Sequence, residues 1–287
     1  MKKISVNLFD TLKIGDDFPT VIMGVLNLSP ESFYQGSVYL NTKALENATI
    51  EMINNGAKML DLGARSTAPW SQKITIEQEI KRIRPAMEQV CKIIPEDIII
   101  SVDTQYSKVA QVAHNISLNH DKKIIINDVS CLKADPTLQD YIIKHDIPVI
   151  LMASKEVPGD LCTIEEIIDE CEKTINQLKI QGYDEKKIII DPGIGKWVEK
   201  KIHVFDLKII GNLQKLRVLN KPILVAISRK SFIGTTLNIS EPENRLNGTL
   251  SSTAIAVFNG AHIVRTHDVD KQLFEMVKMA EEIRKNQ

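Results

Sequence analysis

The fold is decided at residues 20–30, which read Thr20-Val21-Ile22-Met23-Gly24-Val25-Leu26-Asn27-Leu28-Ser29-Pro30. The near-continuous apolar run is typical of a parallel strand that is buried on both faces. In a doubly wound nucleotide-binding sheet, a glycine-rich G-x-G-x-x-G loop would follow the first strand. Here the strand runs into Asn27 and Pro30 with no such loop. The stretch therefore favours a barrel, with the doubly wound sheet as the second candidate.

Seven further apolar, β-branched runs of this kind follow along the chain. The eight predicted strands are Thr20–Leu26, Lys58–Leu62, Asp97–Val102, Lys123–Asn127, Ile147–Met152, Lys186–Ile190, Lys221–Ile227 and Ala261–Thr266. Segments with helical periodicity lie between them, and the strands start far enough apart for a crossover helix each time. Eight strands that alternate with helices predict a single α/β domain, a (β/α)8 TIM barrel.

The predicted barrel occupies residues 20–287, because no linker rich in Pro, Gly or Ser divides the chain. Residues 1–19 precede the first barrel strand and form a short N-terminal lead, a candidate hairpin that closes the barrel floor. Within the barrel we expect a helix at Asn41–Asn55 that ends at Gly56. Thr163 and Asp270 are the expected N-caps of two later helices.

The composition excludes several classes of protein. The 287 residues carry a formal net charge of −1, which argues against a nucleic-acid partner or a membrane surface. No apolar run approaches the ~18 residues of a membrane span, and the start has no signal-peptide pattern. The four cysteines have no metal-ligand spacing, so we expect reduced thiols in a cytoplasmic protein.

Polar side chains follow the predicted strands at the end where a TIM barrel carries its active site. Any one of them has an ordinary explanation as a helix cap or turn former. All of them, however, would open into one mouth. Asp103, Asp191, Asn127 and Lys230 together suit a flat heterocycle that has both donor and acceptor edges.

A second group at the same mouth suits an anion. Arg265 and His267, on and just past the last strand, would face a phosphate or diphosphate. Asn27 could add an oxygen ligand to a Mg²⁺ that the diphosphate carries. The sequence shows no metal cage made by protein side chains alone.

Six segments in this order resemble the dihydropteroate synthase family, a group of pterin-binding TIM barrels. They are Met23–Phe33, Ser101–Thr104, Ile126–Ser130, Asp191–Gly195, Ser228–Gly234 and Arg265–Val269. The resemblance implies condensation of 6-hydroxymethyl-7,8-dihydropterin diphosphate with a 4-aminobenzoate-type amine, with release of pyrophosphate. It also implies a homodimer that binds only small molecules.

By the pattern of that family, each part of the substrates has its own residues. The pterin side is Asp103, Asn127, Met152, Asp191, Lys230 and Arg265; the diphosphate side is Asn27, Arg265 and His267, with Asn27 on the Mg²⁺; the aminobenzoate side is Phe33, Arg65, Ser66, Thr67 and Ser228. The implied catalytic residues are Asp103, Asp191, Lys230, Arg265 and His267. The sequence shows no histidine partner for Ser228, so we expect no protein nucleophile.

Two loops depart from the family pattern. Arg65 stands where the family has Glu in G-G-E-S-T-R-P-G, and Lys196-Trp197 replaces the usual start of F-G-K-[ST]. These changes leave two acceptors open: free 4-aminobenzoate for folate, or a ribofuranosylaminobenzene phosphate for methanopterin. Two other classes also stay open, namely a pterin-dependent methyltransferase that methylates a corrinoid protein, and a pterin-binding protein without catalysis.

Overall fold

Eight parallel strands form a nearly closed barrel in the computed structural model, which describes residues 3–9, 11–29, 36, 38–39, 41–67 and 71–286. In chain order they are β3 (Val21–Asn27), β4 (Met59–Gly63), β5 (Ile99–Asp103), β6 (Ile124–Asp128), β7 (Val149–Met152), β8 (Ile188–Asp191), β9 (Leu224–Ala226) and β10 (Ile263–Thr266). The sheet order is β8-β7-β6-β5-β4-β3-β10-β9. A bridge between Ile190 and Ile223 joins its two edges. The predicted TIM barrel is confirmed.

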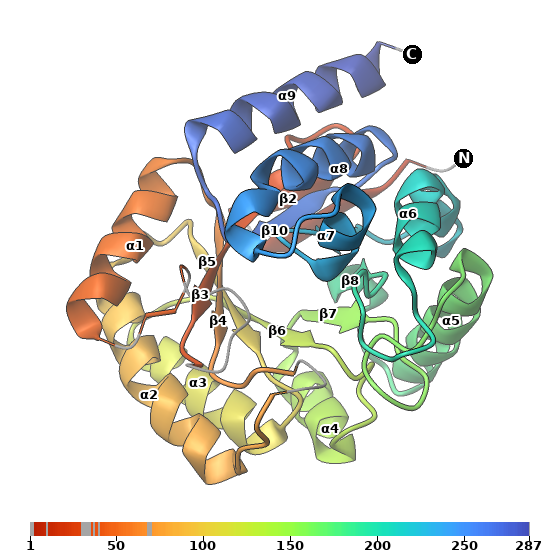
Figure 1. Ribbon diagram of the computed structural model, residues 1–287. Helices are drawn as coiled ribbons and strands as arrows, with labels where there is room; N and C mark the ends of the chain where they lie inside the picture. Colours follow the sequence, from red (N-terminus) through yellow and green to blue (C-terminus); the bar gives the residue numbers. More distant parts are fainter. Residues whose placement is uncertain are drawn as a thin grey trace.

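Helices follow the strands and form the outer layer of the barrel (Figure 1). They are α1 (Thr42–Asn54), α2 (Ile76–Ile93), α3 (Ser107–Asn119), α4 (Pro136–His145), α5 (Ile164–Ile180), α6 (His203–Gly211), α7 (Ser231–Leu237), α8 (Leu246–Phe258) and α9 (Lys271–Lys285). Short 3-10 turns lie at Glu185–Lys187, Leu213–Leu219 and Pro242–Arg245.

The expected helix ends are present. The side chains of Thr163 and Asp270 accept hydrogen bonds from the first turns of α5 and α9, as N-caps do. Asn41 does the same for α1. Gly56, just past the end of α1, has a φ of 99°, which an L side chain rarely adopts.

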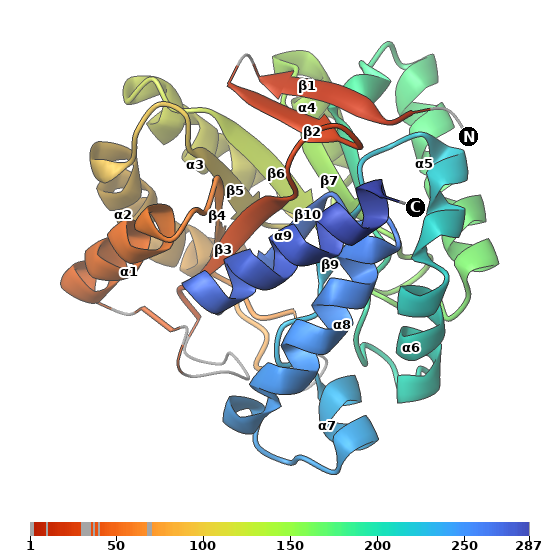
Figure 2. The same cartoon turned by 90° about the horizontal axis from the view of Figure 1, so that it is seen from above.

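The N-terminal lead is a hairpin of β1 (Ser5–Phe9) and β2 (Leu12–Gly15), paired antiparallel. Its apolar side chains pack against the inward-facing residues of the barrel strands, among them Met59 and Ile99. Figure 2 shows the hairpin at one end of the barrel and α7 at the other. The hairpin therefore closes the floor, as expected, and leaves the opposite end open.

Polar contacts fasten the hairpin to the barrel. Asp16, just after β2, accepts two hydrogen bonds from Arg217, at 2.7 and 2.8 Å. These bonds, together with those from the backbone of Ile4 and from His262, hold the pKa of Asp16 well below its ordinary value, although burial opposes them. The floor is thus fixed by apolar packing and by a partly buried ion pair.

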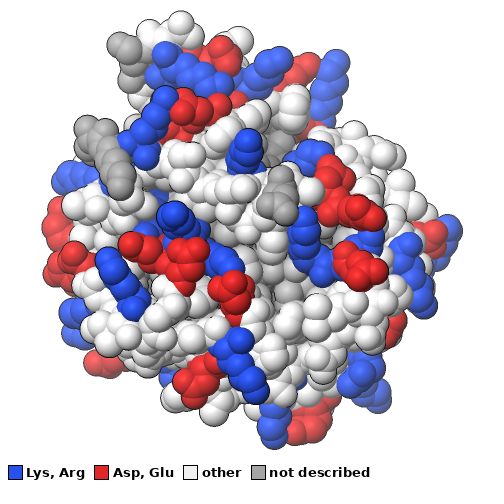
Figure 3. Space-filling model, turned by 180° about the vertical axis from the view of Figure 1, so that it is seen from behind, with Lys and Arg blue, Asp and Glu red and all other residues white. Residues whose placement is uncertain are grey.

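The surface carries charges of both signs. On the face turned away from the viewer of Figure 1, Lys and Arg are interspersed with Asp and Glu (Figure 3). This mixture agrees with the formal net charge of −1. Among the residues that the structure describes, no helix is both long and apolar enough to cross a membrane.

Candidate active site

A cavity of about 340 Å³ opens at the end of the barrel where the strands terminate. Its size lies in the range of small-molecule sites. It is lined by Asn27, Ser29, Arg65, Ser66, Thr67, Asp103, Asn127, Val129, Met152, Asp191, Gly195, Lys196, Trp197, Ala226, Lys230, Ser231, Pro242, Arg245, Arg265 and His267. The structure thus brings together every predicted site residue except Ser228, which is not in the lining, and Phe33, which lies outside the described residues.

The centre of the cavity is an ion-pair cluster around Arg265. Its guanidinium lies 2.6 Å from the carboxylate of Asp61 on β4 and 3.1 Å from that of Asp103 on β5. Asp61 is fully buried and Asp103 only slightly exposed. Burial, and next the neighbouring Asp61 carboxylate, raise the pKa of Asp103, while Arg265 opposes them. Asp103 therefore sits at the cavity wall as a carboxyl group that can both accept and donate.

Asp61 also orients two neighbours. Its Oδ1 accepts hydrogen bonds from Ser101 Oγ at 2.5 Å and from Asn127 Nδ2 at 3.3 Å. The second bond turns the amide of Asn127, and its buried Oδ1 has no partner among the described residues. A buried acceptor without a partner is costly. Since Asn127 lines the cavity, a ligand donor is the natural partner for it.

Asp191 ends β8, Lys230 directly precedes α7, and both line the cavity. Burial raises the pKa of Asp191, and Lys230 partly offsets this. Burial also lowers the pKa of Lys230 to about 8. The Lys230 ammonium donates to the Ile194 carbonyl at 2.5 Å and lies 5.6 Å from the ring centre of Trp197. A carboxyl group and an ammonium thus line the same cavity, and each influences the pKa of the other.

His267 has a partner that the sequence did not reveal. Its Nδ1 lies 2.9 Å from Oγ of Ser228, so the expectation that Ser228 has no histidine partner is wrong. The two residues are far apart in the chain and meet because β9 and β10 are neighbours in the barrel. Ser228 is buried and does not line the cavity, and its hydroxyl contacts the imidazole. Burial, with the nearby Arg265 and Lys230, lowers the pKa of His267 to about 3 and leaves it neutral near pH 7.

Arg65 lines the cavity, and its guanidinium is paired with a carboxylate of the protein. Its Nε donates to Glu79 at 2.5 Å and its Nη1 to the Ile74 carbonyl at 2.7 Å. Its guanidinium also lies 4.9 Å from the ring centre of Tyr106. Glu79 is fully buried and accepts a second bond from Thr104, which follows Asp103 in the chain. The substitution of Glu by Arg at position 65 therefore places a cation opposite a buried carboxylate.

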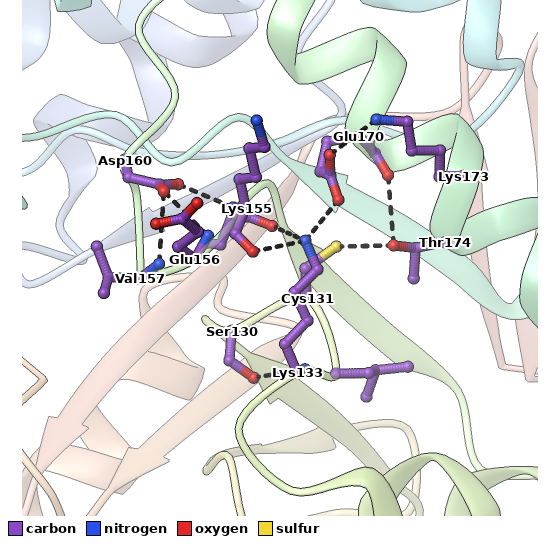
Figure 4. Close-up of polar contacts among 12 residues, drawn as sticks. Ser130, Cys131, Lys133, Lys155, Glu156, Val157, Asp160, Glu170, Lys173 and Thr174 are labelled. Carbon is purple, nitrogen blue, oxygen red and sulfur yellow. Dashed lines mark hydrogen bonds and ion pairs between the residues drawn. The ribbon is translucent and has the colours of Figure 1, made fainter.

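The connection after β7 is held firmly beside the cavity. Lys133 donates to the carbonyl oxygens of Ser154 and Lys155 and pairs with Glu170 on α5 at 2.5 Å (Figure 4). Asp160 accepts from the backbone N–H groups of residues 155, 156 and 157. These contacts place Gly159 directly against the indole of Trp197, so closely that a Cβ at position 159 would overlap it.

Asn27 ends β3 and lines the cavity near Asp103 and His267. Among the described residues, no group of three or more His, Cys, Asp or Glu could hold a metal ion. A Mg²⁺ that arrives with substrate phosphates keeps several waters and needs only one or two protein oxygens. The Asn27 amide fits that limited requirement.

Asp61 was not among the residues predicted for the site. The available signal was an acidic residue inside an apolar run, Met59-Leu60-Asp61-Leu62. A carboxylate at such a place needs partners because an unpaired buried charge is costly. Only the barrel shows that these partners are Arg265 and Asn127. The cavity is also lined by Ser231, Pro242 and Arg245, which were not predicted as site residues.

Known proteins resemble the chain along nearly its whole length. The family model described as "Pterin binding enzyme" matches residues 23–267. A dihydropteroate synthase of Bacillus subtilis is 34% identical over 261 residues, which is 91% of this chain and 87% of the relative. That of Escherichia coli K12 is 32% identical over 271 residues, 91% of this chain and 90% of the relative.

Solved structures agree with these relatives. A dihydropteroate synthase from Coxiella burnetii in complex with pteroic acid superposes with a TM-score of 0.84 at 31% identity, covering 99% of this chain and 100% of that one. The Yersinia pestis enzyme with a sulfonamide drug gives a TM-score of 0.84 at 26% identity, covering 100% of both chains.

Proposed function

The chain belongs to the dihydropteroate synthase family of pterin-binding enzymes, and on this basis we propose how its own residues carry out the transfer. The reaction is the condensation of 6-hydroxymethyl-7,8-dihydropterin diphosphate with a 4-aminobenzoate-type amine. The nitrogen of the amine forms a bond to the pterin methylene carbon, the carbon–oxygen bond breaks, and pyrophosphate leaves. The protein is thus a transferase.

One observation supports the pterin position above all others: Asp103, Asn127, Asp191 and Lys230 converge on one cavity. The free acceptor of Asn127 and the two carboxyl groups match the N–H edge of a pterin, and Lys230 donates to a ring nitrogen or carbonyl. Met152, buried at the end of β7, packs beside the ring.

The diphosphate lies, in this proposal, at Asn27, Arg265 and His267. A neutral His267 whose Nδ1 accepts from Ser228 presents Nε2–H as a donor. Arg265, already between Asp61 and Asp103, adds positive charge where charge develops on the leaving group. A Mg²⁺ held by the diphosphate and Asn27 would supply further charge neutralisation when bound. The electron-rich pterin ring spreads the cationic character left on its methylene.

For the acceptor we propose free 4-aminobenzoate, entering between Ser66, Thr67 and the outer part of the cavity. The phosphorylated riboside of methanopterin synthesis is the alternative that Arg65 first suggested. The positive charge of Arg65 is paired with the carboxylate of Glu79, so Arg65 is less suited to bind the phosphate of that riboside. Lys196 is the exposed cation left at the mouth for that alternative.

The test supplies the purified protein with the pterin diphosphate and each amine in turn, and measures pyrophosphate release. We expect release with 4-aminobenzoate that depends on added Mg²⁺. Use of only the phosphorylated riboside would overturn the acceptor assignment. Binding of pteroic acid with no release from either amine would indicate a pterin-binding protein without catalysis, and methylation of a corrinoid protein would indicate the methyltransferase.

We further propose a cytoplasmic homodimer. The four cysteines are free thiols, which suits a reducing compartment.

The dimer interface is proposed on three neighbouring helices that carry exposed apolar side chains. These side chains are Val204 and Leu207 on α6, Leu237 on α7 and Ile255 on α8. Such a face suits a twofold interface. Sedimentation of the wild type at dimer mass and of Ile255→Glu at monomer mass would agree with this face, whereas a monomeric wild type would refute it.

A further inference from the structure

A fully buried lysine lies beneath the wall of the cavity that carries Lys230. Lys201 lies just before α6, and Asp206 lies on that helix. Neither side chain is exposed to solvent, and Lys201 Nζ lies 3.9 Å from Asp206 Oδ1. Neither residue lines the cavity. Two buried charges are retained only where they make specific contacts, since each is costly to remove from water.

Two of those contacts are made with the segment Gly193–Gly195 that follows β8. Lys201 Nζ donates to the carbonyl of Gly193 at 2.6 Å. The N–H of Gly195 donates to Asp206 Oδ1 at 2.8 Å. The Gly195 N–H and the Ile194 carbonyl belong to the same peptide group, and this carbonyl accepts the hydrogen bond of the Lys230 ammonium at 2.5 Å. Asp206 thus holds the peptide group that bonds Lys230, and Lys201 holds the peptide group before it.

The backbone of this segment requires glycine at two positions. Gly193 and Gly195 have φ values of 70° and 125°, which few L residues adopt. A Cβ on Gly195 would lie 3.1 Å from Cδ of Lys230, so the lysine stem passes directly over the glycine. Lys201 also donates to Gly159 at 3.4 Å, and Gly159 abuts Trp197. The same buried amine therefore contacts the peptide group that precedes the Ile194 carbonyl and the loop behind Trp197.

We propose that Lys201 and Asp206 are positioning residues for the pterin site, which set the location of the Lys230 ammonium through the Ile194 carbonyl. This inference rests on the proposed role of Lys230 at the pterin. It adds that the pair acts on pterin affinity without contacting the substrate. A shift of a contact group by about 1 Å can change rates by ~100-fold, so even a small relaxation of the segment is measurable.

The decisive experiment is a double-mutant cycle between Lys201→Met and Lys230→Met, with the dissociation constant of pteroic acid as readout. We expect Lys201→Met alone to weaken binding about tenfold, and to add less than about twofold when Lys230 is already methionine. If the two effects multiply, or if Lys201→Met leaves the dissociation constant unchanged, the proposal is wrong. Lys200→Met, an exposed neighbour, is the matched control and should bind as the wild type does.

Two further variants separate positioning from loss of folding. Lys201→Met/Asp206→Asn removes both buried charges together, so this variant should fold. Its affinity for pteroic acid should nevertheless be lower than that of the wild type, because the contact with Gly193 is gone. Asp206→Asn keeps an acceptor for Gly195 N–H, whereas Asp206→Leu does not. We expect the asparagine variant to bind close to the wild type and the leucine variant about tenfold more weakly. Equal losses in the two would contradict the proposal.

Steady-state kinetics give an independent readout. The KM for the pterin diphosphate should rise in Lys201→Met, while the KM for 4-aminobenzoate stays within about twofold of the wild type. Equal rises in both would mean a general disturbance and would overturn the inference. If the wild type itself releases no pyrophosphate, the proposed function fails, yet the pteroic acid cycle still decides the role of Lys201.

Discussion

The carboxylate of Asp61 lies 2.6 Å from the guanidinium of Arg265, although the two residues are 204 positions apart in the chain. Asp61 is fully buried, and its other oxygen accepts from Ser101 and Asn127. One carboxylate therefore orients both a cation and an amide that line the cavity. It supports the site from beneath without lining the cavity itself.

Replacement of Asp61 by Asn should destabilise the protein. The variant keeps the shape but removes the charge opposite Arg265, and hydrogen bonds to charged groups contribute about 1.5–3 kcal/mol. We expect the free energy of unfolding in urea to fall by about 2 kcal/mol. Asp97→Asn is the control, because Asp97 pairs with Lys58 at the surface and should matter by less than about 1 kcal/mol. Equal effects would show that burial of the Asp61 pair has no special importance.

Asp191→Asn and Lys230→Met should each weaken the binding of pteroic acid. Each variant removes one charged hydrogen-bond partner from the proposed pterin site, which corresponds to roughly 10- to 100-fold in the dissociation constant. Titration calorimetry would measure it. Lys43→Met, on the exposed side of α1, serves as the control with the same loss of charge. Unchanged affinity in both variants would remove these residues from the site.

The ion pair between Arg65 and Glu79 should show strong coupling. Arg65→Met leaves the carboxylate of Glu79 buried without its cation, and breaking a buried pair in this way typically costs about 3–5 kcal/mol. Arg65→Met/Glu79→Gln restores neutrality and should recover at least half of that loss in urea unfolding. Additive losses would argue that the two side chains do not stabilise each other.

Acid should destabilise the wild type more than His267→Gln. The folded-state pKa of His267 is lowered to about 3 from the ordinary 6.5, so the unfolded chain binds the extra proton first. The stability linked to this group is therefore complete above about pH 6.5 and is lost as the pH falls towards 3. Between pH 8 and pH 5 the wild type should lose about 1–2 kcal/mol more than the variant. Parallel pH profiles in chemical unfolding would contradict this assignment.

The order of residues along the chain was sufficient to predict the fold and many of the residues that line the cavity. Every predicted strand is present, because parallel barrel strands are buried on both faces and must be apolar throughout. The topology then places all strand ends at one mouth, so reading the residues after each run found Asp103, Asn127, Asp191, Lys230, Arg265 and His267. The hairpin that closes the floor was also expected from its place before the first strand.

The partners of these residues could not be predicted. Ser228 meets His267, Arg65 meets Glu79, and Lys201 meets Gly193 across loops whose paths no local pattern specifies. Hydrogen bonds and ion pairs depend on positions within about 3.5 Å, whereas a sequence pattern fixes only which face of a strand or helix is buried.

The sequence by itself determined the barrel, the end at which the cavity opens and many of the residue types that line it. Only the tertiary structure decided how charge is distributed there: Arg65 is matched by Glu79, His267 is neutral beside Ser228, and Lys230 is placed over a segment held by Lys201 and Asp206. The physical reason is that burial and neighbouring charges set the protonation and direction of a side chain, and both arise from residues distant in the chain.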